Sequence, residues 1–233
     1  MTLAAPAISI IIPVLNETER INETIALLRE SDSGKESEIV VVDGDAAAST
    51  LAAVLDGSVR GIISARGRAV QMNRGAEAAS GDILLFLHAD TLLPPHALSL
   101  IRRAMKDGRS VAGAFDLGFD TKRTIFRVTE KYVFLRTRLT KIPFGDQAIF
   151  IRRDYFRNLG GYREIPVMED VDLMKRIRKK GDRIRIIPVK VSTSPRRYER
   201  EGILSCTFRN WVLQALFAMG VPPERLAKRY RSL

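Results

Sequence analysis

Acidic side chains follow three separate apolar runs of this sequence, and they are the first residues whose positions suggest chemistry. Glu17 comes shortly after the run 8–14, Asp43 ends the run 38–42, and Asp90 follows the run 83–87. A carboxylate at the end of a buried run needs a cation or a set of hydrogen-bond donors. Carboxylate oxygens are ligands that Mg²⁺ and Mn²⁺ prefer, often together with substrate phosphates. We therefore predict that Asp90 holds a divalent cation beside a diphosphate.

Glu169 and Asp170 form a second acidic group, at the start of a segment with helical spacing over residues 169–180. Neighbouring helical residues point about 100° apart, so only one of the two carboxylates can face a given substrate. The N-terminal end of a helix also keeps a carboxylate ionised, as a general base requires. We predict that Asp170 is a general base for a hydroxyl group and that Glu169 supports it, with Asp146 as the next candidate.

Each of these acids also has a structural interpretation. Asp90 would suit a helix N-cap, and Asp43 beside Gly44 would suit a turn. Glu169 and Asp170 would also stabilise a helix start by matching the helix dipole. A purely structural role is a good explanation for any one of these acids, but a weaker one for three acids at the same rim. The structural and the functional interpretation both remain open at this point.

The elements that must position these residues follow a regular order in the first half of the chain. Runs rich in β-branched residues alternate with segments of helical spacing, which is typical of a parallel sheet with right-handed crossovers. Ligands bind such sheets beyond the carboxyl ends of the strands, so the acids should meet at one rim. The expected strands are residues 8–14, 38–45, 61–64 and 83–87, and the expected helices carry Ile21 to Leu28 and span residues 69–79 and 95–105.

The second half of the chain has a less regular pattern. Strands are expected at residues 111–115, 147–151 and 184–191, the last interrupted at Pro188, and helices at residues 124–139, 169–180 and 203–219. No internal repeat or low-complexity linker divides the sequence. The pattern predicts a single α/β domain over residues 1–233, with a mainly parallel central sheet flanked by helices and a C-terminal helical extension over residues 201–233.

Composition limits the kind of site and its location. The chain has one cysteine, Cys206, and two histidines, so it can form no internal disulfide, and a thiolate or imidazole zinc site is not expected. The first run lacks a following Gly-x-Gly-x-x-Gly, which argues against an ordinary dinucleotide site. No Gly-Lys-Ser or Gly-Lys-Thr occurs, which excludes a P-loop. We recognise neither a signal peptide nor an apolar stretch long enough to span a bilayer, and therefore expect a cytoplasmic protein.

Five short segments follow one another in a definite order: residues 10–17, 41–44, 66–76, 87–90 and 168–173. Taken together and in this order, they resemble glycosyltransferase family 2. Two further segments, residues 145–150 and 194–198, are similar to a small bacterial branch of that family. The resemblance implies a GT-A fold, in which residues 1–110 form a half that binds a nucleotide sugar and residues 111–200 a half that binds an acceptor. It also implies inverting transfer of a sugar from a nucleotide-diphosphate sugar to an acceptor hydroxyl, assisted by Mn²⁺ or Mg²⁺.

The resemblance implies roles for individual residues. Asp90 matches the last acid of the family's metal-binding Asp-x-Asp motif, whereas His88 stands where the first acid is expected and would weaken the metal site or bind ribose or phosphate. Asp170 matches the acid that acts as general base, and Glu169 precedes it. The residues implied to lie along the nucleotide are Pro13, Leu15, Glu17, Asp43, Arg66, Arg68, His88, Ala89 and Asp90. The residues implied near phosphate or acceptor are Asp146, Gln147, Arg196 and Arg197, and the two arginines could stabilise a leaving phosphate.

Other function classes and partners follow from the charge. The net charge of +11 predicts an anionic partner, and the basic segment 121–141 with the C-terminal amphipathic helix favours an anionic membrane surface. A lipid-linked acceptor would explain such a contact. A metal-dependent nucleotidyltransferase is the rival enzyme, but residues 13–17 lack the glycine and lysine of its first loop. A basic nucleic-acid-binding protein is the non-enzymatic rival, but aromatic residues make up only 7% of the chain and do not alternate with the arginines, so we expect no nucleic-acid partner.

Overall fold

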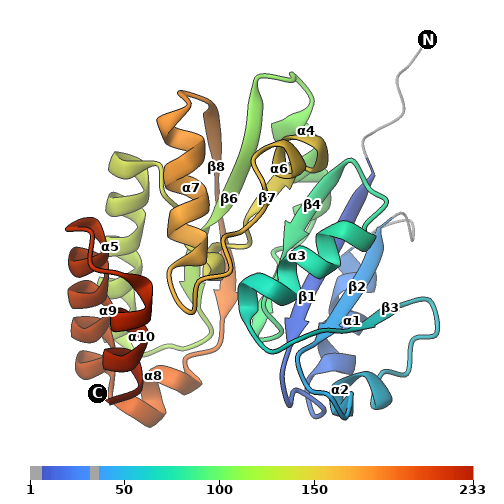
Figure 1. The fold of residues 1–233 in the computed structure, drawn as a ribbon, viewed down its shortest axis with the longest axis horizontal. Coiled ribbons are helices and arrows are strands. Elements are labelled where there is room, and N and C mark those ends of the chain that lie inside the picture. Colours follow the sequence, from blue (N-terminus) through green and yellow to red (C-terminus); the bar gives the residue numbers. More distant parts are fainter. Residues whose placement is uncertain (1–6, 32–36, 233) are drawn as a thin grey trace.

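The computed structural model describes residues 7–31 and 37–232. These residues form one sheet with the strand order β3-β2-β1-β4-β7-β6-β8-β5 (Figure 1). Helices cover both of its faces, as expected for an α/β protein. The strands are β1 (Ile8–Val14), β2 (Glu38–Asp43), β3 (Arg60–Ile63), β4 (Ile83–Phe86), β5 (Thr91–Leu92), β6 (Ser110–Phe119), β7 (Phe150–Arg152) and β8 (Arg183–Thr193).

Four strands of the first half, β1 to β4, run parallel to one another. β1 lies between β2 and β4, and β3 pairs with the outer side of β2. Consecutive residues of β1, such as Ile10, Ile11 and Ile12, are all fully buried, because alternate side chains enter the cores on opposite faces of the sheet. The continuous apolar runs therefore predicted both the strands and their parallel arrangement correctly.

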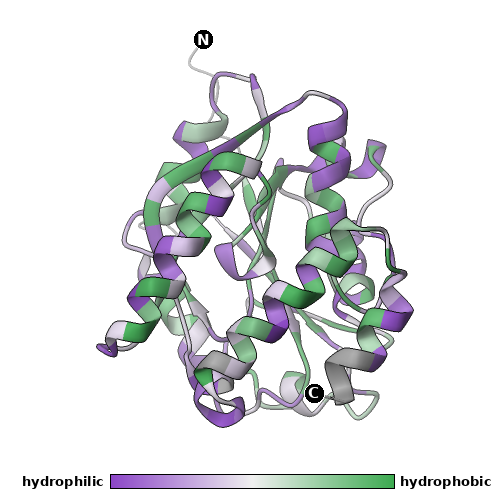
Figure 2. Ribbon diagram, turned by 90° about the vertical axis from the view of Figure 1, so that its left-hand side faces the viewer, coloured by the Kyte–Doolittle hydropathy of each residue, from purple (hydrophilic) through white to green (hydrophobic). Residues whose placement is uncertain are grey.

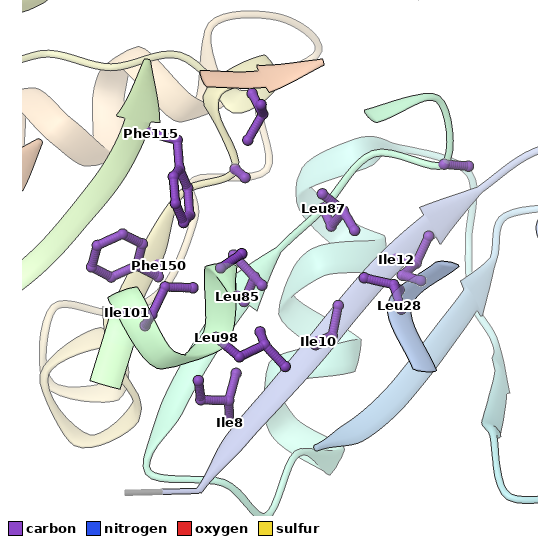
Figure 3. Close-up of a cluster of buried hydrophobic side chains, with 14 of the residues drawn as sticks. Ile8, Ile10, Ile12, Leu28, Leu85, Leu87, Leu98, Ile101, Phe115 and Phe150 are labelled. Carbon is purple, nitrogen blue, oxygen red and sulfur yellow. The ribbon is translucent and has the colours of Figure 1, made fainter. Parts of the chain in front are cut away.

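Helices from the first half hold the sheet on both sides. On one face, α1 (Ile21–Ser31) and α4 (Ala97–Met105) bring Leu28 and Leu98 against β1, as the core in Figure 3 shows. On the other face, α3 (Arg68–Ala78) lies so close that a Cβ added to Gly75 would come 2.4 Å from the Cγ2 atom of Ile11. Only glycine permits this approach, which brings the N-terminal end of α3 to the carboxyl ends of β1 and β2.

The remaining strands, β5 to β8, run in both directions. The sequence pattern did not predict the direction of each of these strands. β7 is antiparallel to both β4 and β6, and β5 is antiparallel to β8, whereas β6 and β8 are parallel. The strand expected at residues 147–151 begins only at Phe150, because Gly145–Gln147 form a short 3-10 helix, η1, and Ala148 follows with φ of 49°. This correction matters for function, since η1 lies beside the candidate site.

The expected interruption at Pro188 is a bulge in β8. Phe115 of β6 pairs with Ile187, but the next residue, Asp116, pairs with Lys190, so Pro188 and Val189 fall outside the regular ladder. Proline lacks the N–H that a central strand must donate, and a bulge removes that requirement. β8 then continues to Thr193 and carries the chain to the same rim as β1, β2 and β4.

The remaining helices lie mostly in the second half. α6 and α7 share the face of α3, while α8, α9 and α10 lie beside α5 at the edge farthest from β3 (Figure 1). The sequence pattern did not predict α2, α6, α8 or α10 individually; α10 begins at Pro223, and proline is favoured as the first residue of a helix. Among the described residues, no helix combines the length and apolarity needed to cross a bilayer. These helices are α2 (Ser49–Ala52), α5 (Thr124–Thr140), α6 (Arg153–Asn158), α7 (Glu169–Lys179), α8 (Arg196–Glu201), α9 (Ile203–Ala218) and α10 (Pro223–Ser232).

Candidate active site

The carboxyl ends of β1 and β2 are joined into one rim by a buried amide. Gln71 of α3 donates through Nε2 to the carbonyls of Val14 and Val42, at 2.7 and 2.8 Å. The backbone N–H of Gly44 also donates to the Val14 carbonyl at 2.9 Å. The ends of these two strands therefore meet as the sequence predicted.

Asp43 organises this rim from inside. Its side chain is fully buried; one oxygen accepts from the N–H of Asp45 at 2.9 Å, and the other accepts from the N–H groups of Thr50 and Leu51 at 2.9 and 3.3 Å. Both oxygens are thus used in shaping the loop after β2. These contacts agree with the interpretation of Asp43 as a residue that forms a turn. Any contact with a nucleoside would come from the loop that Asp43 holds.

The loop after β1 places Glu17 near Asp90. The Glu17 N–H donates to Thr50 Oγ1 at 3.1 Å, while Pro13 and Leu15 are partly exposed. Burial raises the pKa of Glu17, the negative charge of Asp90 raises it further, and the charge of Arg196 lowers it. Three segments that are distant in the sequence therefore face one space.

Asp90 occupies an exposed turn after β4. The turn is held by backbone carbonyls: Ala89 accepts from Thr24 Oγ1 at 2.8 Å, and Asp90 accepts from the N–H of Ser194 at 3.0 Å. The N-cap interpretation of Asp90 is wrong, because the two residues that follow form β5 and α4 starts only at Ala97. Within residues 7–31 and 37–232, the Asp90 carboxylate accepts no hydrogen bond and is left for a ligand.

The two acids at the start of α7 lie in different surroundings. Glu169 is only 3% exposed, and its Oε1 lies 3.4 Å from an Nη atom of Arg68 at the start of α3. Asp170 is partly exposed and accepts from the N–H of Gly145 at 2.6 Å and from that of Val171 at 2.7 Å. One acid of the pair therefore holds an arginine while the other remains accessible, which is the division expected from their positions on the helix.

Gly145 brings the second half of the chain against the rim of the first half. A Cβ added to Gly145 would lie 3.1 Å from His88 Nε2 and 3.3 Å from Asp170 Oδ2. His88, Gly145 and Asp170 are therefore neighbours, although they come from three different segments. Burial, with a smaller contribution from the charge of Arg68, lowers the pKa of His88 to about 3, so its ring is neutral at physiological pH.

Asp146 presents a polar atom without a partner. Its Oδ1 is buried and makes no hydrogen bond with any residue the structure describes. Burial raises the pKa of Asp146 to about 6; the charge of Arg136 opposes this, and the charges of Asp170 and Asp90 add to it. A buried unpaired carboxylate oxygen is costly, so this atom is suited to a ligand, either a cation or a hydroxyl group.

Gln147 is fully buried and shapes the η1 turn. Its Oε1 accepts from the N–H of Phe144 and from Arg136 Nη2, both at 3.1 Å, and its Nε2 donates to the Phe115 carbonyl at 2.9 Å. The amide is engaged with protein groups, so its placement supports a positioning role for Gln147. The guanidinium of Arg136 also lies over the Phe144 ring, 3.5 Å from its centroid.

Gln147→Ala should lower the free energy of unfolding by about 2–4 kcal/mol, because it leaves a buried N–H and a buried carbonyl without partners and creates a cavity. Urea denaturation of the parent and the variant measures this change. Gln214→Ala, a change of the same residue type on a partly exposed position of α9, should change stability by less than about 0.5 kcal/mol. Equal stability of the two variants would contradict the structural role of Gln147.

Arg136 is a site residue that the sequence did not reveal. It lies on α5, far in sequence from every motif, and its charge acts on both Asp146 and Asp170. Burial lowers its pKa, but an arginine remains protonated at physiological pH. Only the packing of α5 against η1 shows that this cation belongs to the site.

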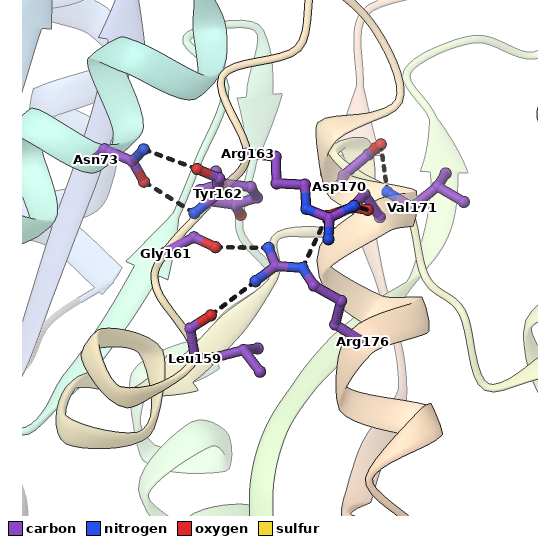
Figure 4. A network of polar contacts seen from close by, with 9 residues as sticks. Asn73, Leu159, Gly161, Tyr162, Arg163, Asp170, Val171 and Arg176 are labelled. Atoms are coloured by element: carbon purple, nitrogen blue, oxygen red, sulfur yellow. Dashed lines mark hydrogen bonds and ion pairs between the residues drawn. The ribbon is translucent and has the colours of Figure 1, made fainter. Parts of the chain in front are cut away.

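A polar network positions the start of α7. Figure 4 shows Asn73 of α3 exchanging two hydrogen bonds of 2.9 Å with the backbone of Tyr162. Arg176 of α7 donates to the carbonyls of Leu159 and Gly161 at 2.9 and 2.5 Å. The loop before α7 is thereby tied to both halves of the molecule, which holds Glu169 and Asp170 at the rim.

Glu169→Gln should remove part of the pH dependence of stability between about pH 4.5 and 6. Burial, and to a smaller extent the charge of Asp170, raises the pKa of Glu169 from 4.5 to about 6, although Arg68 opposes the shift. In this window the folded chain binds more protons than the unfolded chain, so stability is highest below it and falls as the pH rises through it. Urea unfolding across the window should show a flatter profile for Glu169→Gln, whereas Glu164→Gln, at an exposed acid, should follow the parent. Identical slopes would show that the Glu169 pKa is unshifted.

The remaining predicted site residues are arginines. Arg66 is exposed in the loop before α3, and Arg68 at the start of α3 contacts Glu169. Arg196, at the start of α8, is exposed, and its charge acts on Glu17. The side chain of Arg197 lies outside the part of the chain that the structure describes.

The residues present suit a divalent cation whose coordination is completed by a substrate. Among residues 7–31 and 37–232, no group of three or more His, Cys, Asp or Glu side chains could hold a metal ion. Asp90 nevertheless carries an available carboxylate, and the buried Oδ1 of Asp146 lacks a partner. Two hard oxygen donors with diphosphate oxygens match the way proteins bind Mg²⁺ and Mn²⁺, so the fit depends on a phosphate-bearing ligand.

Comparison of the chain with known proteins shows which family it matches. Residues 9–160 match the family model "Glycosyl transferase family 2". Over 111 residues, the chain is 31% identical to the dolichol-phosphate mannosyltransferase of Pyrococcus furiosus. The matched segment covers 45% of this chain and 32% of that protein. The chain thus spans about a third of the length of that curated relative.

Solved structures share the fold. The mannosyltransferase PcManGT from Pyrobaculum calidifontis, in complex with GDP-Man and Mn²⁺, matches 80% of this chain and 56% of its own with a TM-score of 0.61 and 21% identity. S. aureus TarS matches 81% of this chain and 36% of its own with a TM-score of 0.62 and 16% identity. These likenesses show the GT-A fold that the sequence resemblance implied.

Proposed function

The chain belongs to glycosyltransferase family 2, and from that premise we propose that it transfers a sugar from a nucleotide-diphosphate sugar to an acceptor hydroxyl, with inversion at the anomeric carbon. The observation that carries the proposal is the contact of two halves at one site. The turn that contains His88 and Asp90 closes the first half, and Gly145 brings Asp170 of the second half against His88. This contact supports an arrangement in which the donor would lie opposite the base, as an inverting displacement requires.

We propose a nucleotide-sugar donor of the mannose class. Both the curated relative and one structural relative are named mannosyltransferases, and the latter is a complex with GDP-Man. The nucleoside would lie along the loops after β1 and β2, where Pro13 and Leu15 are partly exposed and Asp43 holds the loop. Arg66 and Arg196 are exposed cations beside this rim and would contact the diphosphate.

Asp90 would hold the divalent cation, with the Asp146 Oδ1 as a second oxygen that faces the same region. A bound Mn²⁺ or Mg²⁺ supplies Lewis-acid stabilisation of the departing diphosphate. His88 replaces the expected first acid; as a neutral ring, it would hydrogen-bond a ribose or phosphate oxygen without adding a negative charge. The turn after β4 therefore provides one carboxylate where an Asp-x-Asp motif has two, and Asp146 and the donor would complete the coordination.

Asp170 would accept the proton of the acceptor hydroxyl. Its two oxygens are oriented by the N–H groups of Gly145 and Val171, and it is partly exposed where Glu169 is buried. Glu169 would keep Arg68 in place at the entrance of the nucleotide site. The second half of the chain would bind the acceptor, for which we propose a lipid-linked molecule.

The test is a screen of nucleotide sugars for metal-dependent turnover. GDP-mannose with Mn²⁺ should be hydrolysed slowly or transferred, and the nucleotide with Mn²⁺ should raise the melting temperature more than either does alone. Incubation with a nucleoside triphosphate and sugar phosphate, read as pyrophosphate release, tests the nucleotidyltransferase alternative. Stabilisation by single-stranded DNA, but not by nucleotide and Mn²⁺, would contradict the proposed function.

A further inference from the structure

The outward side of α5 carries a stripe of exposed apolar side chains. The core-facing side of this helix is separate and includes Phe126 and Val133. Residues that recur every three or four positions share one side of a helix, so the exposed set is a continuous stripe. It consists of Val128, Tyr132, Leu135 and Leu139, which are between 37% and 73% exposed.

The neighbouring helix α9 carries a second such stripe. Its core-facing side includes the buried Cys206 and Leu213. The outward side again shows spacings of three and four residues. It consists of Phe208, Trp211 and Ala215 of α9 together with Met219 directly after the helix, all of which are exposed.

The two stripes meet and form one surface, which we call the outer helical surface. The ring centroids of Tyr132 and Trp211 lie 4.9 Å apart, so the stripes are in contact at their middle. Figure 2 faces this edge of the molecule and shows hydrophobic residues recurring along its helices. Contiguous exposed apolar surface of this kind is uncommon on a soluble domain and marks a contact with a protein or a membrane.

The exposed charges on α5 and α9 themselves are positive. Helices α5 and α9 contain one carboxylate, Glu130, which is 4% exposed and paired with Arg127 and Lys190. Lys131, between Val128 and Leu135 along α5, is exposed. The surface therefore offers cations and apolar groups but no exposed carboxylate from either helix.

A basic cavity continues this surface at the C-terminal end of α5. Its volume is about 500 Å³, and Arg138 and Lys141, which flank the exposed Leu139, line it. Its single carboxylate, Asp182, accepts a hydrogen bond of 2.6 Å from the hydroxyl of Tyr155. Four lining cations form no ion pair within the described part of the chain: Lys141, Arg178, Arg183 and Arg185.

We propose that the outer helical surface docks on an anionic phospholipid membrane, with the apolar stripes in the interface and the cavity cations at lipid headgroups. Charge decides between this occupant and a second copy of the chain, because two copies meeting through this surface would oppose cation to cation. Apolar side chains at the acyl boundary and cations at anionic headgroups are the arrangement by which amphipathic helices bind membranes. The contact would keep the enzyme at a membrane independently of sugar transfer.

The single tryptophan of the chain provides a direct test, because Trp211 lies within the outer helical surface. Vesicles of phosphatidylcholine mixed with phosphatidylglycerol should bind the full chain in sedimentation and shift the Trp211 emission to the blue. Vesicles of phosphatidylcholine alone should bind it weakly, and added salt should release it from the anionic vesicles. Neither donor nor acceptor is present, so the outcome does not depend on the proposed function.

Two variants separate the apolar and the ionic contributions. Leu135→Gln/Leu139→Gln should weaken vesicle binding by about tenfold or more. In the parent, both leucine side chains would move from water into the apolar part of the membrane, and the glutamines lose that favourable transfer. Lys141→Gln/Arg183→Gln should weaken it by about fivefold for each removed cation. The matched controls are Leu55→Gln, at an exposed leucine outside the surface, and Lys106→Gln, at an exposed lysine after α4; both should bind like the parent.

Three results would overturn the proposal. The first is equal recovery of the protein in the supernatant with and without anionic vesicles at low salt. The second is vesicle binding without a change in Trp211 emission, which would indicate a different surface. The third is concentration-dependent dimerisation of the protein alone, measured by analytical ultracentrifugation, that Leu135→Gln/Leu139→Gln abolishes; this would assign the surface to a second copy.

Discussion

Asp170→Asn is expected to lower the turnover of sugar transfer by about 10²–10⁴-fold, the usual contribution of a general base. The asparagine keeps the size of the side chain and can still accept from the N–H of Gly145, so the site should keep its shape. It cannot take the proton of the acceptor hydroxyl as that oxygen attacks the anomeric carbon. Turnover should be measured at saturating donor, so that a change in binding does not mask the change in chemistry.

Glu169→Gln is the comparison that tests the assignment within the pair. Glu169 is buried against Arg68, so its loss should disturb the entrance to the nucleotide site more than the proton transfer. We expect a higher KM for the donor and a much smaller decrease in kcat than for Asp170→Asn. The assignment is reversed if Glu169→Gln abolishes turnover while Asp170→Asn stays active.

A third outcome would move the base to another residue. If both variants keep full activity, the two acids only stabilise the start of α7, and Asp146 becomes the candidate. Its Oδ1 is buried without a partner among the described residues, and burial raises the pKa of Asp146 to about 6. A carboxylate with this pKa can accept a proton at physiological pH. Asp146→Asn would then show the loss expected of Asp170→Asn.

Asp90→Asn is expected to lower turnover by about 10²–10³-fold at a fixed Mn²⁺ concentration. Stabilisation of a departing diphosphate by a metal ion is worth several kcal/mol, and neutralising the one exposed carboxylate of the turn should remove most of it. The fold should persist, because the side chain makes no hydrogen bond within the described residues and the turn is held by backbone carbonyls. Raising the Mn²⁺ concentration should recover part of the lost rate.

Binding of Mn²⁺ provides a readout that does not need turnover. Electron paramagnetic resonance should show that the parent takes up Mn²⁺ in the presence of a nucleoside diphosphate and that Asp90→Asn does so much more weakly. Asp154→Asn, the same change at an exposed acid of α6, should bind like the parent. Unchanged Mn²⁺ uptake by Asp90→Asn would show that Asp90 is not a metal ligand.

The sequence by itself determined the first half of the fold and the position of its acids. Runs such as Ile10–Ile12 of β1 are apolar at consecutive residues, as expected of a strand that is buried on both faces, and parallel strands place their carboxyl ends together. Asp90 and the loops after β1 and β2 could therefore be assigned to one rim. The start of α7 was also readable, because acids, helical spacing and a following glycine are local signals.

Only the tertiary structure decided which groups are free to act. Asp43 and Asp90 look alike in sequence, but both oxygens of Asp43 accept from backbone N–H groups, whereas the Asp90 carboxylate accepts no hydrogen bond from any residue that the structure describes. The meeting of His88, Gly145 and Asp170 depends on β7 entering the sheet antiparallel beside β4, which no local pattern specifies. Arg136 joins the site through the packing of α5. Such contacts join residues that are far apart in the chain, and the energy of burial and hydrogen bonding that selects them is set by the folded neighbours rather than by local sequence.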